Sequence, residues 1–140
     1  MLALVVLFIV AISAPFFMIA GRAWSGRSRR WAVDRPEYGA FHRLNYLPLK
    51  AGAAGIWVLS FIPGAMARVS GSDAAEAIEF YTVFPVGMVL VAAKFWWPAA
   101  LAPQWQKEWV ARGGDVGAVD VPLWGPGETV PERAKKKGLQ

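Results

Sequence analysis

The sequence predicts an all-α membrane protein with three transmembrane helices. Its 140 residues include three apolar stretches without charge, Leu2 to Ala20, Ala51 to Ala67 and Phe80 to Ala93. As a helix, the first stretch of 19 residues would cover about 28 Å, close to the roughly 30 Å hydrocarbon core of a bilayer. Charged segments separate these stretches, and 56% of the chain is hydrophobic. We place the membrane spans at about 2–20, 51–67 and 80–97.

The charge of the connecting segments predicts the orientation. The segment 21–50 holds seven basic and two acidic residues, a net charge of +5, whereas 68–79 holds one arginine and three carboxylates, a net charge of −2. Cytoplasmic loops carry the excess of Lys and Arg, so we expect an N-out, C-in protein with the first loop and the tail in the cytoplasm. No charge precedes the first stretch, so it lacks the basic start of a signal peptide and is expected to be retained. The expected location is the bacterial inner (cytoplasmic) membrane, crossed several times.

The long first loop mixes arginines with aromatic residues. This composition is typical of a segment at the level of the lipid headgroups, where guanidinium groups meet phosphates and indole rings settle. A docking surface for an acidic partner is the alternative, and the two are compatible. The residues of this loop that we expect at a lipid or partner interface are Arg22, Trp24, Arg27, Arg29, Arg30, Trp31 and Arg43.

The second span is rich in small residues. Ala51 with Gly55, and Ser60 with Gly64, form two pairs at the spacing that lets helix backbones approach closely in lipid. These four residues are the predicted packing positions, either against a partner or against the other two spans. Pro63 is expected to bend the end of this helix.

The third span is followed by a basic and tryptophan-rich stretch. Lys94 can extend its ammonium group to the interface, and the segment 98–112 is predicted to lie on the cytoplasmic surface as an interrupted amphipathic helix. We therefore expect a three-helix membrane domain over 1–112 and an irregular, extended cytoplasmic tail over 113–140. The interface residues expected in this part are Lys94, Trp96, Trp97, Trp105 and Trp109.

Few residues are suited to catalysis or cofactor binding. The chain has no cysteine and one histidine, and a single imidazole cannot by itself complete a zinc or bis-histidine haem site. No carboxylate lies inside the three stretches, which argues against a proton pump or cation carrier. We expect no enzymatic activity, no metal site, no cofactor and no nucleic-acid partner. His42 remains a candidate axial ligand if a partner completes the pocket.

These features predict a small accessory or structural subunit of a larger membrane complex. Expected partners are other membrane subunits and anionic phospholipids, and an energy-transducing complex, respiratory or photosynthetic, is one candidate. Two alternatives stay open: a homo-oligomeric transporter or channel built around the second span, and a membrane anchor contributing His42 to a haem or chlorophyll site.

Overall fold

The computed structural model describes residues 1–34, 45–95, 98–118 and 120–130, with side chains throughout except at 93–95. Within these ranges the chain is all-helical and has no strand, as predicted. The helices are α1 (Leu2–Trp24), α2 (Leu47–Leu59), α3 (Ile62–Val69), α4 (Ala75–Phe95) and α5 (Gln104–Ala111), with short 3-10 helices η1 (Arg30–Ala32) and η2 (Ala99–Leu101).

Among the described residues, three helical segments are long and apolar enough to cross a membrane: Leu2–Trp24, Leu47–Val69, which combines α2 with α3, and Ala75–Ala92. This confirms the prediction of three helices able to span a membrane. The third helix begins at Ala75, five residues before the predicted start at Phe80, and therefore carries Glu76 in its first turn, where a carboxylate is favoured by the helix dipole.

The second span is divided into α2 and α3 by Pro63. This residue has no backbone N–H, and its ring clashes with the carbonyl four residues earlier, which belongs to Leu59, the last residue of α2. At this point the Ser60 hydroxyl donates to the carbonyl of Trp57 at 2.6 Å. The bend expected near Pro63 is thus a helix break at Ser60 and Phe61.

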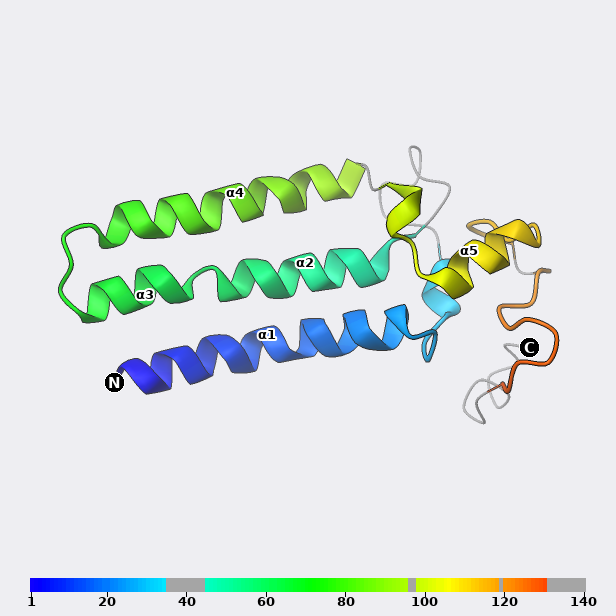
Figure 1. The fold of residues 1–140 in the computed structure, drawn as a ribbon, viewed down its shortest axis with the longest axis horizontal. Coiled ribbons are helices and arrows are strands. Elements are labelled where there is room, and N and C mark those ends of the chain that lie inside the picture. The colour runs from blue at the N-terminus through cyan, green and yellow to red at the C-terminus, as the bar shows by residue number, and fades with distance from the viewer. Residues whose placement is uncertain (35–44, 96–97, 119, 131–140) are drawn as a thin grey trace. The chain divides into compact units, whose positions relative to one another are not determined.

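The described chain divides into two compact units. The first, here called the span unit, comprises Met1–Gly21 and Pro48–Lys94; the second, the tryptophan unit, comprises Arg22–Leu47 and Phe95–Gln140. In the span unit α2 and α3 form one column that lies between α1 and α4 (Figure 1). The tryptophan unit holds the buried hydrophobic cluster.

Glycines set the contacts within the span unit. A Cβ at Gly55 would lie 2.9 Å from the ring of Phe17 on α1, and one at Gly87 would lie 3.2 Å from the Trp57 indole nitrogen. A Cβ at Gly64 would lie 2.7 Å from Cβ of Glu79 on α4. Each neighbour therefore occupies the space that a larger residue would need, which is how small residues bring helices together in lipid.

Candidate functional site

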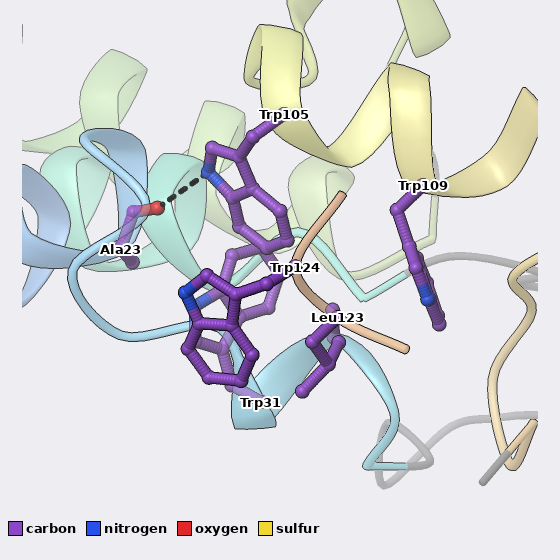
Figure 2. Packing of buried hydrophobic residues seen from close by; sticks show 7 residues of the cluster. Ala23, Trp31, Trp105, Trp109, Leu123 and Trp124 are labelled. Carbon is purple, nitrogen blue, oxygen red and sulfur yellow. Dashed lines mark hydrogen bonds between the residues drawn. The ribbon is translucent and has the colours of Figure 1, made fainter. Parts of the chain in front are cut away.

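The tryptophan unit is built around four indole rings contributed by three distant segments (Figure 2). Trp31 comes from η1, Trp105 and Trp109 from α5, and Trp124 from the segment after α5; their exposed fractions are 6, 7, 0 and 8%. Trp31 and Trp105 meet edge to face, with centroids 5.4 Å apart, an arrangement worth about 0.5–1.5 kcal/mol beyond simple burial. These indoles form a protein core.

Three of the indole N–H groups donate to backbone carbonyls. Trp31 donates to Ser28 at 2.6 Å, Trp105 to Ala23 at 3.1 Å, and Trp109 to Val121 at 3.3 Å. Burying an indole N–H without a partner is unfavourable. These bonds therefore favour one placement of the rings relative to the turn after α1 and to the segment after α5.

Arg29 joins the beginning of the tryptophan unit to its C-terminal segment. Its Nη1 donates to the carbonyl of Leu123 at 2.8 Å and to the Glu128 carboxylate at 2.6 Å, while Nη2 donates to the second carboxylate oxygen at 3.1 Å. The guanidinium carbon also lies 5.0 Å from the ring centroid of Trp105 and 5.6 Å from that of Trp124. This combines a bidentate ion pair with cation–π contacts.

An amide network supports the same unit from α5. Gln106 is fully buried, and its Nε2 donates to the carbonyl of Asn45 at 2.9 Å. Asn45 in turn donates to the carbonyls of Trp31 at 2.8 Å and Asp34 at 3.2 Å. Burial raises the pKa of the neighbouring Tyr46 hydroxyl. The Oε1 of Gln106 has no hydrogen-bond partner in the described part of the chain.

The predicted packing residues lie mostly in the interior. Ala51, Gly55 and Gly64 are buried, and the last two are the close contacts with Phe17 and Glu79 described above. Ser60 lies at the helix break, where its hydroxyl bonds within the same helix column. The structure thus uses two of the small residues for packing between helices of one chain.

The predicted interface residues separate into two groups. Arg22, Trp24, Arg27 and Arg30 are exposed and are here called the basic rim. Trp31, Trp105, Trp109 and Arg29 are instead buried and contribute to the core. His42, Arg43, Trp96 and Trp97, like the Lys94 side chain, lie outside the described residues.

Sequence reasoning missed the contribution of the C-terminal segment. Leu123 and Trp124 are buried at 5 and 8% exposure, and Gly117 donates its N–H to the Val33 carbonyl at 2.8 Å. The adjacent Leu and Trp were the available signal, because large apolar residues within a polar, proline-containing tail indicate a buried contact.

The described residues of the tryptophan unit offer no candidate metal site. No group of three or more His, Cys, Asp or Glu suited to a metal ion occurs within the ranges that the structure describes. Arg29 and Glu128 form an ion pair with each other. Comparisons with models of known families, with curated proteins and with solved structures found no match.

Acidification is expected to release the C-terminal segment. The pKa of Glu128 lies below its ordinary value because the carboxylate accepts hydrogen bonds from Arg29 and from the backbone N–H of Gly125. A lowered pKa in the folded state stabilises the fold above the ordinary carboxyl value, and this contribution is lost as the pH falls below about 4. Hydrogen exchange at 121–125, corrected for intrinsic rates, should show lower protection at that pH.

Two variants distinguish loss of the Arg29–Glu128 ion pair from other effects of low pH on the protein. Glu128→Gln should lower protection at 121–125 at neutral pH and remove most of its pH dependence, whereas Asp120→Asn, at an exposed position, should leave both unchanged. Wild-type pH dependence in Glu128→Gln would contradict the assignment.

Proposed function

We propose that this chain is a small, non-catalytic accessory subunit of a multi-subunit complex in the bacterial inner membrane, oriented N-out, C-in. The observation that carries the proposal is the low burial of its spans. Only 6, 17 and 6% of the residues in the three apolar windows are buried within the chain. Most of their surface is therefore available to lipid or to helices of other subunits.

One face of α4 has the composition of a protein contact. Phe80, Phe84, Met88 and Val91 follow at intervals of four, four and three residues, and are between 52 and 55% exposed. We call these residues the α4 stripe. Phe80 and Phe84 already stack on each other, with centroids 5.0 Å apart. Aromatic residues and methionine are enriched at protein interfaces, which favours a partner helix on this face.

The basic rim supplies a second contact in this proposal. Arg22, Arg27 and Arg30 are exposed and close in sequence to the exposed Trp24, a combination suited to anionic phospholipid headgroups or to an acidic subunit. An energy-transducing complex remains one class of assembly that fits a subunit of this kind.

Isolation of the tagged chain from its native membrane in mild detergent tests this function. We expect different integral membrane subunits to co-purify at a fixed stoichiometry. A particle containing only this chain would contradict the proposal and would instead favour a homo-oligomeric channel or transporter.

A double variant of the α4 stripe is expected to disrupt the complex. Phe84→Ala with Met88→Ala removes two exposed apolar side chains from the proposed contact, so the co-purifying subunits should be lost while the chain remains in the membrane. The control is Leu4→Ala with Met18→Ala on α1, whose side chains are 71 and 61% exposed. Equal loss of partners from both double variants would show that the α4 stripe is not a specific contact.

A further inference from the structure

The span unit contains an apolar groove with one ion pair in its lining. Its volume is about 350 Å³, within the roughly 300–1,000 Å³ typical of ligand sites. Arg68 on α3 and Glu79 on α4 are its charged lining residues. The apolar lining comes from Phe8, Ile9, Ile12, Val58, Phe61 and Ala65.

The ion pair leaves one donor and one acceptor available. Both Nε and Nη2 of Arg68 donate to the same carboxylate oxygen of Glu79, Oε2, at 3.0 and 2.6 Å. Within the described residues, Nη1 of Arg68 and Oε1 of Glu79 therefore have no hydrogen-bond partner. The two side chains are 55 and 31% exposed, so a ligand can reach both atoms.

The ion pair lies close to the polar end of the span unit. Arg68 is in the last turn of α3, and the following residues 69–74 are exposed and include Asp73. Glu79 is in the second turn of α4. In a bilayer such a connection belongs at headgroup level, because its backbone needs water or polar partners. The apolar side of the groove then faces the acyl chains.

We propose that this groove binds a zwitterionic phospholipid whose headgroup carries a primary ammonium, of the phosphatidylethanolamine type. Its phosphate accepts a hydrogen bond from Nη1 of Arg68, its ammonium donates to Oε1 of Glu79, and one acyl chain occupies the apolar groove. The adjacent opposite charges of the protein thus meet the adjacent opposite charges of the headgroup.

The local charge selects among phospholipids. Glu76, one turn before Glu79, does not line the groove but also attracts the Arg68 guanidinium, so two carboxylates act on one cation at this end of the groove. A headgroup with net negative charge, as in phosphatidylglycerol, meets an excess of negative charge. A choline headgroup has no N–H to donate. Of these three headgroups, phosphatidylethanolamine alone combines a phosphate that accepts from Nη1 of Arg68 with a charged N–H donor for Oε1 of Glu79.

Native mass spectrometry of the full chain with phosphatidylethanolamine, phosphatidylcholine and phosphatidylglycerol of identical acyl chains tests the proposal. We expect the first to bind at least fivefold more tightly than the other two. Glu79→Gln should abolish this preference and increase phosphatidylglycerol binding. Equal affinity for all three lipids in the wild-type chain would overturn the proposal.

A pair of α1 variants tests the groove. Ile12→Trp fills the groove and should lower phosphatidylethanolamine binding at least fivefold. Ile19→Trp adds the same ring at another exposed position of α1 and should bind like the wild type. Circular dichroism checks that both variants keep their helices. Wild-type binding by a helical Ile12→Trp variant would overturn the proposal as well.

Discussion

Replacing Gly114 with alanine is expected to destabilise the tryptophan unit strongly. Its Cβ would overlap ring atoms of Trp109, whose side chain is fully buried and whose N–H donates to the Val121 carbonyl. Gly114 also donates its backbone N–H to the Trp109 carbonyl at 3.0 Å, at the end of α5. The Trp109 ring and the Gly114 backbone are thus both held in place. Overpacking a core costs roughly 1–3 kcal/mol and sometimes more, and we expect about 3 kcal/mol.

Hydrogen exchange of α5 within the full chain measures this loss. Gly125→Ala is the matched control, because its Cβ would lie 3.1 Å from an exposed Arg112 side chain, which can move away. That variant should change the local stability by less than about 0.5 kcal/mol. Similar protection of α5 in both variants would contradict the packing described for Trp109.

Replacing Gly64 with alanine is expected to separate α3 from α4. The new Cβ would lie 2.7 Å from Cβ and 3.2 Å from Cα of Glu79. Because Cα is backbone, α4 itself has to shift, which also displaces the carboxylate that accepts from Arg68. We expect the free energy of unfolding of the span unit in detergent to fall by about 1–3 kcal/mol.

Gly52→Ala provides the comparison in the same helix column. Its Cβ would meet Cβ of Ala20 at 3.8 Å, an ordinary contact, and alanine has the higher helix propensity. This variant should unfold at the same detergent or denaturant concentration as the wild type, or slightly above it. Equal destabilisation by the two substitutions would show that Gly64 is not a close contact.

The three spans could be predicted because length and hydropathy determine them directly. A run such as Leu2 to Ala20 is long enough to cross a bilayer, and its composition identifies the solvent in which it is stable. The ends of the helices were harder to predict. The helix α1 continues to Trp24 and α4 begins at Ala75, because charged and small residues next to an apolar run continue a helix readily. The orientation of the chain in the membrane remains a prediction.

The tryptophan unit was harder to predict because its pattern has two explanations. Trp105 and Trp109 are spaced by four residues, which places them on one face of a helix. That spacing does not say whether the face meets lipid or protein, and the structure buries both rings among Trp31, Leu123 and Trp124. The last two lie in a segment without periodicity, so only long-range packing reveals their role.

The long sequence separation within the tryptophan unit has a consequence for biosynthesis. Arg29 binds Leu123 and Glu128, which are 94 and 99 positions further along the chain. The first span precedes Trp31, and the second and third spans are translated between Trp31 and Trp124, so the unit can close only after all three have been synthesised. Until then Trp31 and the two α5 indoles lack their final neighbours, and exposed apolar surface of this kind is prone to aggregation or capture by chaperones. Any subunit that recognises the closed unit therefore recognises a chain whose spans have already been synthesised, and assembly through this unit follows synthesis of the membrane part.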